Sequence, residues 1–309
     1  MNKLVVGVNF WNTGAGEQLC RMSLADFRER YPDNVQLYSP RVGADGYCPE
    51  EFIDLPVLKQ MCRDIIPGSK LRKPIVHEMV DSLAAVAESP DDLLVLLNSD
   101  IWLTPAAEHL LIHGQLGNGA CFSRVDFSPT NCDPETASFA HDFPNGWDMF
   151  VFKASWWREF RDRFLDLPCV LAERAWDNAY ACTMKAYGDV QWFNKVPYIF
   201  HQPHKRRWGF TSLEGNWCGQ KWLSTGWEKL WRPHVAQMKL RVYLNQEIHP
   251  SSLIAELSSE KKFETFRTGL WTKQEEPARS TVQKDSRIPE ATLTRASLAR
   301  DRGRSSTFR

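Results

Sequence analysis

Short apolar runs alternate with amphipathic stretches along the N-terminal third of the chain. The runs at 3–8, 34–39 and 93–97 have the length and the apolar content of buried strands. Residues 17–31, between the first two runs, carry Leu, Met and Phe at helical spacing with charged residues between them. A chain that opens strand–helix–strand in this way predicts a parallel sheet with helices packed on its faces.

The same alternation continues towards the C-terminus. Pro74 is expected in the first turn of a helix that extends to Val86, and Thr104 and Pro105 are expected to cap and begin a helix over 106–112. The other expected elements are strands at 120–125 and 147–152, helices at 153–164 and 172–187, a short helical piece at 55–63 and a long loop at 126–145. Short apolar runs also occur at 191–193 and 196–200. Together they predict a large α/β domain.

Composition divides the chain near residue 275. Residues 275–309 contain one aromatic residue and many Ser, Thr and Arg, a composition that cannot bury enough apolar surface to fold. We therefore expect a folded region over 1–274 and a disordered basic tail over 275–309. The tail is expected to be solvated, and its arginines could also contact an acidic partner.

Charge and hydropathy exclude several classes of partner. The chain has 38 basic and 38 acidic residues, so no global field favours nucleic acid or a membrane surface. No stretch approaches the roughly 20 apolar residues of a membrane span, and the N-terminal apolar run is too short for a secretory signal. The eight cysteines are scattered without a C-x-x-C pair and are expected to be reduced thiols of a cytoplasmic protein, with disulfides as the alternative.

Tryptophan is abundant, with 13 residues in the chain. Five of them lie between Trp208 and Trp231 at a spacing that fits neither a strand nor a heptad. This segment is expected to form a cover of loop and helix over one face of the fold. Such an excess of tryptophan predicts either a large aromatic core or a stacking surface for a ligand.

The polar triplet Asn98-Ser99-Asp100 comes directly after the buried strand at 93–97. Ligands of open α/β sheets bind at the carboxyl ends of the strands, so Asp100 is expected to project into the binding crevice. A carboxylate beside an amide oxygen suits Mg²⁺ or Mn²⁺, which also bind phosphate oxygens. The alternative is that Asn98 and Asp100 only turn the chain and cap the next element.

Four later polar residues also fall at or near strand ends: Asp148, Asp177, His201 and His204. Their order fits metal-assisted transfer from a nucleotide diphosphate, in which a carboxylate takes a proton from the attacking hydroxyl and a histidine completes the metal shell. Each also has a simpler explanation, as a turn cap, an exposed carboxylate or a histidine of a polar loop.

Several residues are candidates for binding the nucleotide part of a donor. The loop that begins at Asn9 and Phe10 is expected to line a pocket, but its glycines lack the spacing of a dinucleotide fingerprint. Lys73 could contact a phosphate or could simply be solvated. Lys205 begins a run of three positive charges suited to a departing diphosphate. The complete expected set is Asn9, Phe10, Ser39, Lys73, Asn98 and Lys205.

Four short motifs occur in the order Asn98-Ser99-Asp100-Ile101, then residues 146–152, then Trp176-Asp177-Asn178, then His201-Gln202-Pro203-His204. This series resembles that of glycosyltransferase-like proteins of the GT-A fold, which carry N-S-D-I, G-x-D-x-F-V-F, W-D-N and H-Q-x-H. The resemblance spans about residues 4–210. The first position of the D-x-D-like triplet is Asn98 rather than Asp.

The resemblance implies a Rossmann-like GT-A fold, with a mixed, mainly parallel sheet flanked by helices. Residues 1–105 would form the nucleotide-binding half and 106–274 the acceptor-binding half. Asp100, with His201 or His204, would hold Mn²⁺ or Mg²⁺. Asp148 would bind hydroxyls of the donor or acceptor, and Asp177 would be the catalytic base.

The resulting expectation is a metal-dependent glycosyltransferase that acts on a nucleotide sugar and an acceptor, which could be a glycan, a small molecule or a protein. The first alternative is a carbohydrate- or nucleotide-sugar-binding protein that has lost turnover. The second is a metal-dependent hydrolase or nucleotidyltransferase, which would be expected to have paired acidic ligands at one strand end. Fold-level analogy does not by itself give function.

Overall fold

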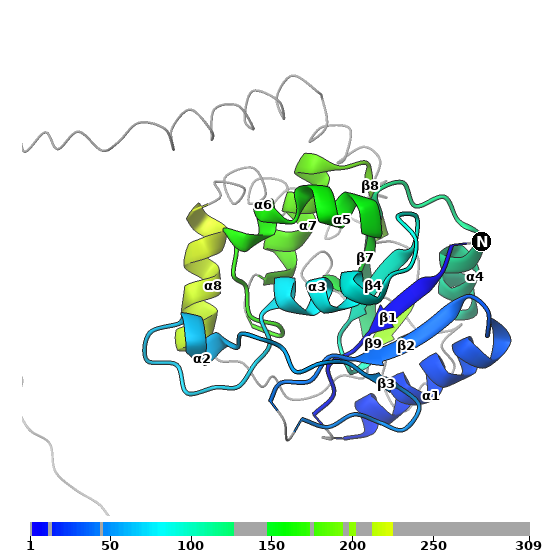
Figure 1. Cartoon of the computed structure of the whole chain (residues 1–309), viewed down its shortest axis with the longest axis horizontal. Helices are drawn as coiled ribbons and strands as arrows, with labels where there is room; N and C mark the ends of the chain where they lie inside the picture. The colour runs from blue at the N-terminus through cyan, green and yellow to red at the C-terminus, as the bar shows by residue number, and fades with distance from the viewer. Residues whose placement is uncertain are drawn as a thin grey trace, which may run out of the picture.

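The computed structural model describes residues 2–11, 14–43, 46–126, 147–173, 176–193, 198–201 and 212–224. These residues form a mixed α/β structure in which helices pack on both faces of a curled sheet (Figure 1). The expected tail, nearly all of the loop expected at 126–145, and residues 208–211 and 225–231 of the tryptophan-rich segment lie outside the described residues. None of the described helices is long and apolar enough to span a membrane.

The sheet has the order β3-β2-β1-β4-β7-β6-β9-β5, with β8 also paired to β6. The strands are β1 (Leu4–Gly7), β2 (Val35–Ser39), β3 (Ile53–Asp54), β4 (Leu93–Leu97), β5 (Ile101–Leu103), β6 (Gly119–Asp126), β7 (Trp147–Lys153), β8 (Val190–Phe193) and β9 (Ile199–His201). Of the pairings between these strands, β4–β7, β6–β7 and β5–β9 are antiparallel and the other five are parallel. The prediction of a mixed, mainly parallel sheet is therefore confirmed.

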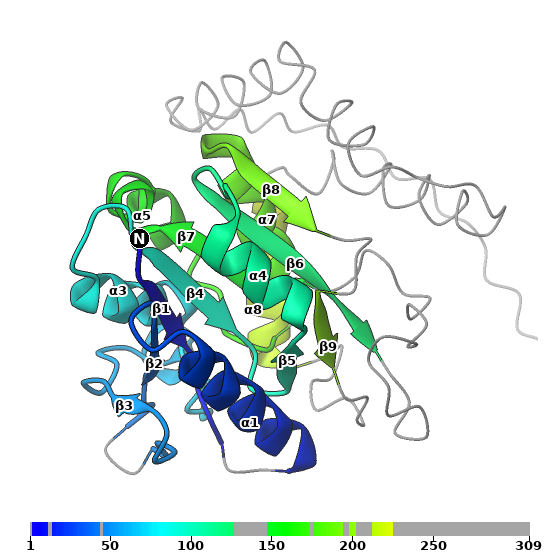
Figure 2. The same ribbon diagram turned by 90° about the vertical axis from the view of Figure 1, so that its right-hand side faces the viewer.

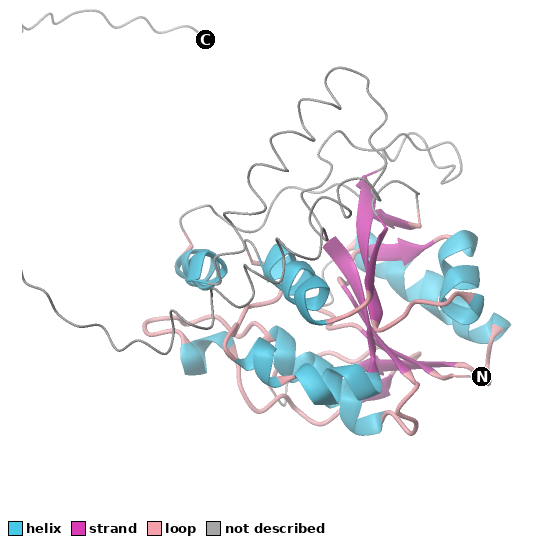
Figure 3. Ribbon diagram, turned by 90° about the horizontal axis from the view of Figure 1, so that it is seen from above, coloured by secondary structure: helices cyan, strands magenta, loops and turns pink. Residues whose placement is uncertain are grey.

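The helices cover the two faces of the sheet unequally. They are α1 (Ala15–Arg30), α2 (Cys62–Ile65), α3 (Val76–Val86), α4 (Pro105–His113), α5 (Ala154–Phe160), α6 (Asp162–Leu165), α7 (Trp176–Tyr187) and α8 (Leu213–Ser224). Figure 2 shows α1 and α4 in front of the sheet, and their apolar residues share one core with every second residue of β1 and β4. Seen from above, helices flank the strands on both sides (Figure 3).

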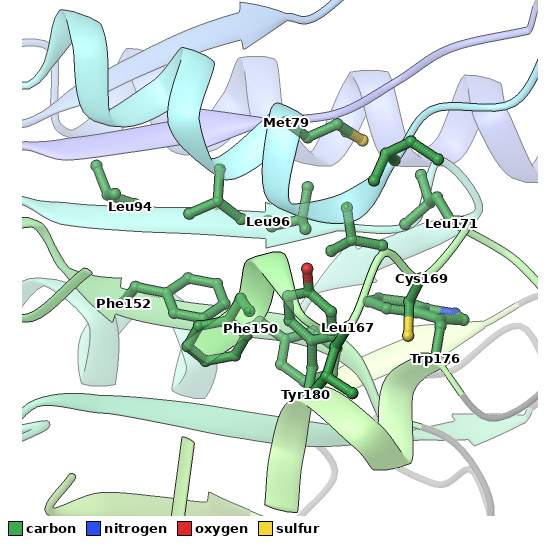
Figure 4. Close-up of a cluster of buried hydrophobic side chains, with 14 of the residues drawn as sticks. Met79, Leu94, Leu96, Phe150, Phe152, Leu167, Cys169, Leu171, Trp176 and Tyr180 are labelled. Atoms are coloured by element: carbon green, nitrogen blue, oxygen red, sulfur yellow. The ribbon is translucent and has the colours of Figure 1, made fainter. Parts of the chain in front are cut away.

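The second core lies on the other face of the sheet, under α3, α5 and α7, and is rich in aromatic side chains (Figure 4). Phe150 of β7 is fully buried and packs against the rings of Trp176 and Tyr180 from α7, with centroids 5.1 and 6.4 Å apart. This packing fixes the start of α7, and so the position of Asp177, against β7. Part of the tryptophan excess therefore belongs to the core.

Some expected boundaries are wrong. The helical piece expected at 55–63 is only α2, because the residues before Cys62 run extended and Met61 bridges to Pro74. That bridge also delays α3 to Val76. The helix expected at 153–164 breaks at Arg161 into α5 and α6. The helix expected at 172–187 starts only at Trp176, since Ala172 has a left-handed backbone conformation, with φ of 58°.

The strand directions bring distant parts of the chain to one edge of the sheet. The parallel strands β1, β2, β4 and β6 end at this edge, and β7, which runs antiparallel between β4 and β6, begins there. The short strand β9 ends at the same edge, because it is parallel to β6. The short strand β5 begins there, because it is antiparallel to β9. Polar residues at these termini therefore meet.

Candidate active site

Asp148 lies at the centre of this edge, next to the end of β4. Leu97 pairs with Met149, and the backbone N–H of Asn98 donates to the carbonyl oxygen of Asp148 at 3.0 Å. On its other side, β7 contains a bulge, because Phe122 pairs with Met149 but the next residue of β6, Ser123, pairs with Trp147. Asp148 is the extra residue. Bulges redirect side chains and are frequent beside active sites.

The carboxylate of Asp148 is held on both oxygens. Oδ1 accepts a hydrogen bond from Nδ2 of Asn98 at 2.5 Å, and Oδ2 accepts one from Nη1 of Arg124 at 2.9 Å. Asp148 is buried, with 4% of its surface exposed. Hydrogen bonds to ionised groups are stronger than neutral ones, and buried charges require partners. The carboxylate of Asp148 is therefore held in one position at the edge of the sheet.

Asp177 lies beside this group, in the first turn of α7, and is half-buried. Its Oδ2 accepts a hydrogen bond from the backbone N–H of Trp147 at 3.1 Å. Loss of hydration and the neighbouring Asp148 carboxylate raise the pKa of Asp177 to about 6, although backbone N–H groups and the Arg124 charge act in the opposite direction. A carboxyl with a pKa this close to neutrality can exchange a proton at physiological pH.

Asp100 and His201 form a second pair at the same edge. Ile101 of β5 pairs with His201 of β9, and this brings Oδ2 of Asp100 to 3.4 Å from Nε2 of His201. A divalent ion in a nucleotide site often has one or two protein ligands, with phosphate oxygens and water supplying the others. Within the described ranges, no group of three or more His, Cys, Asp or Glu could hold a metal. Asp100 and His201 could supply two of the ligands of such an ion.

Two asparagine oxygens point to a polar ligand. Continuing the β1–β4 register places Asn9 opposite Asn98, since Gly7 pairs with Leu96. Nδ2 of Asn9 donates to the carbonyl oxygen of Pro40 at 2.7 Å, and Nδ2 of Asn98 donates to Asp148. These acceptors fix which side of each amide group carries the nitrogen and which carries the oxygen. Among the described residues, Oδ1 of each is buried without a hydrogen-bond partner. Buried polar atoms are rarely left unsatisfied, so both are candidates to accept from a ligand or an ordered water.

The other expected cofactor-binding residues have different surroundings. Phe10 is buried and packs edge-to-face on Phe52, with centroids 4.8 Å apart. Ser39, the last residue of β2, is fully buried. Lys73 donates to Oε1 of buried Glu173 at 2.5 Å. These contacts give Phe10 and Lys73 structural roles, and their contacts with a cofactor stay predictions. His204 and Lys205 lie outside the described residues.

Sequence reasoning missed Arg124 and the pairing of Asn98 with Asp148. The strand expected at 120–125 included Arg124 without a function. A signal was present, because an arginine near the end of a strand that is parallel to β4 lies at the same edge as Asp100. The antiparallel direction of β7, which brings Asp148 to Arg124, left no comparable signal in the sequence.

We expect Asp177→Asn to gain stability relative to the wild-type protein as the pH rises. Because the pKa of Asp177 is raised in the folded chain from 3.8 to about 6, the wild-type protein loses stability between these pH values and does not regain it above them. Asn carries no charge and its oxygen can still accept from Trp147. The free energy of unfolding of the variant should therefore gain about 1–2 kcal/mol on the wild type between pH 4.5 and pH 7.5, after allowance for the partial exposure of Asp177. Denaturant titrations at both pH values measure this difference, and a difference independent of pH would contradict the raised pKa.

Comparison with known proteins adds no family assignment to this geometry. No protein-family model matches the chain, and no curated protein matches it. The resemblance to GT-A glycosyltransferases therefore stays a prediction from the four motifs.

Proposed function

We propose that this chain is a metal-dependent glycosyltransferase of the GT-A type, which moves a sugar from a nucleotide-diphosphate donor to an acceptor hydroxyl. The observation that carries the proposal is the meeting of two groups at one sheet edge. One is the Asp100–His201 pair, in which Oδ2 of Asp100 lies 3.4 Å from Nε2 of His201. The other is the Asn98–Asp148–Arg124 cluster with Asp177 beside it.

Each group has a distinct part in the proposed reaction. Asp100 and His201 would hold Mn²⁺ or Mg²⁺, and the ion would neutralise charge on the departing diphosphate. Asn9 and Asn98 would accept hydrogen bonds from hydroxyl groups of the donor, since their amide nitrogens are already used. Asp148, with both oxygens hydrogen-bonded, would orient Asn98.

Asp177 would be the proton acceptor. In an inverting transfer, the acceptor oxygen bonds to the anomeric carbon while the bond from that carbon to the diphosphate oxygen breaks. The hydroxyl proton must leave, and Asp177 would take it and later release it to water. With a pKa of about 6, this carboxyl is mostly ionised at pH 7 and close to the range in which general bases work best.

A second candidate is a binding protein that recognises nucleotide sugars without turnover. The observation that favours it is the internal pairing of Asp148, which needs no substrate to satisfy its oxygens. The pairing of Lys73 with Glu173, rather than with an open site, points the same way. This candidate keeps donor binding and loses only the chemical step.

A turnover assay separates the candidates. The protein is incubated with a panel of UDP-, GDP- and dTDP-linked hexoses in Mn²⁺, in Mg²⁺ or in EDTA, and release of the nucleoside diphosphate is measured with and without simple sugar acceptors. Metal-dependent release from at least one donor is the expected result. Donor binding without release would favour the binding protein, and neither binding nor release would contradict both candidates.

A further inference from the structure

Arg124 is a residue to which no role in sugar transfer has yet been assigned. It lies near the end of β6 with its side chain 33% exposed, and its Nη1 donates to Oδ2 of Asp148 at 2.9 Å. The bulge at Asp148 and the parallel course of β6 and β4 leave this carboxylate between Arg124 on one strand and Asn98 on another.

The two carboxylates are held by different kinds of donor. Each oxygen of Asp148 receives an N–H donor from a side chain, and one of these side chains, Arg124, is charged. Asp177 is held by uncharged backbone N–H groups, that of Trp147 at Oδ2 and that of Asn178.

The charges around Asp177 are few. From the described elements packed against it, the ionised groups that face it are Asp148 on β7 and Arg124 on β6. Its charge also reaches two buried thiols, which are neutral at physiological pH: a hydrogen bond with Cys218 and burial raise the pKa of Cys169, and burial raises the pKa of Cys182. Burial is the largest cause of the raised pKa of Asp177, and Asp148 and Arg124 are the charges that act on it in addition.

We propose that Arg124 is a positioning residue: with Asn98 it fixes both oxygens of Asp148 beside Asp177, and its charge acts on Asp177, which exchanges the proton of the acceptor hydroxyl. This inference rests on the proposed function. It adds a role for Arg124, a residue that the motifs did not contain. Its readout is the titration of Asp177, which does not require turnover.

The experiment records the carboxyl ¹³C signal of Asp177 against pH, with Asp177→Asn used to assign it. Arg124→Met removes the charge and is expected to move the Asp177 inflection upward from near pH 6, because a neighbouring positive charge favours the ionised form. Arg124→Lys keeps the charge, so its Asp177 inflection should lie close to that of the wild type. Arg30→Met is the matched control, because Arg30 also pairs with a buried carboxylate, that of Glu108, through two hydrogen bonds.

An inflection in Arg124→Met that coincides with the wild type overturns the proposal, as does an equal shift in Arg30→Met. If Arg124→Met does not fold, Arg124→Gln, which keeps an N–H donor without the charge, takes its place with the same expectation. With an active donor, the acidic limb of kcat/KM should move upward with the titration; an unmoved limb refutes the role of Arg124 and leaves the proposed function standing. Absence of turnover in the wild type overturns the proposed function, and the titration then still decides whether the charge of Arg124 acts on Asp177.

Discussion

Asp177→Asn is expected to lower the rate of sugar transfer by about 10²–10⁴-fold, the usual contribution of a positioned general base. The amide is close in shape to the carboxylate and its oxygen can still accept from the Trp147 backbone, so the start of α7 should be undisturbed. Donor affinity should survive, since the residues expected to bind the donor are Asn9, Asn98, Asp100 and His201. The change therefore acts on kcat and leaves the dissociation constant of the donor nearly unaltered.

The measurement is release of nucleoside diphosphate by the variant, compared with Asp26→Asn as a control. Asp26 is exposed on α1, so its replacement changes the net charge by the same amount away from the site. Unchanged kcat in Asp177→Asn would show that Asp177 is not the base, as in a retaining transfer, where no base is needed opposite the donor. A loss of donor affinity equal to the loss of rate would instead place Asp177 in binding.

Much of the arrangement of residues 1–105 could be predicted because its signals are local. Residues 93–97 form five consecutive buried positions, the pattern of a parallel strand with both faces covered. The start of α4 also depends on local chemistry, since Thr104 accepts from the backbone N–H of Ala107 at 3.2 Å and Pro105 occupies the first turn. Such features depend on neighbours within a few residues.

The candidate site could be predicted only in part. A polar residue after a buried strand was enough to single out Asp100, and the motif series singled out Asp148, Asp177 and His201. Their contacts depend on non-local facts: the antiparallel course of β7, the bulge at Asp148 and the pairing of β5 with β9. None of these features produces a periodic pattern of apolar and polar residues in the sequence, so the role of Arg124 was not predicted.

Lys73 illustrates a different limit. Its place just before an expected helix suggested a phosphate contact, but the structure pairs it with Glu173, 100 residues away in the chain. Ala172, with its left-handed backbone, precedes this glutamate, and Ser212 donates to the other oxygen of the same carboxylate at 3.0 Å. A buried carboxylate takes the nearest cation, and sequence spacing cannot identify that partner.

Metal-dependent binding of a nucleoside diphosphate tests the central claim most directly. Melting temperatures are measured for the wild type, for Asp100→Ala and for the exposed-site control Asp26→Ala, each with UDP, GDP or dTDP in Mn²⁺ or EDTA. At a nucleotide concentration 100-fold above its dissociation constant, binding stabilises the folded protein by about 2.7 kcal/mol, which corresponds to a rise of roughly 5–10 °C for a domain of this size. We expect this rise in the wild type and in Asp26→Ala with Mn²⁺, and its loss in EDTA and in Asp100→Ala. An equal rise in Asp100→Ala, or a wild-type rise that persists in EDTA, would contradict the account.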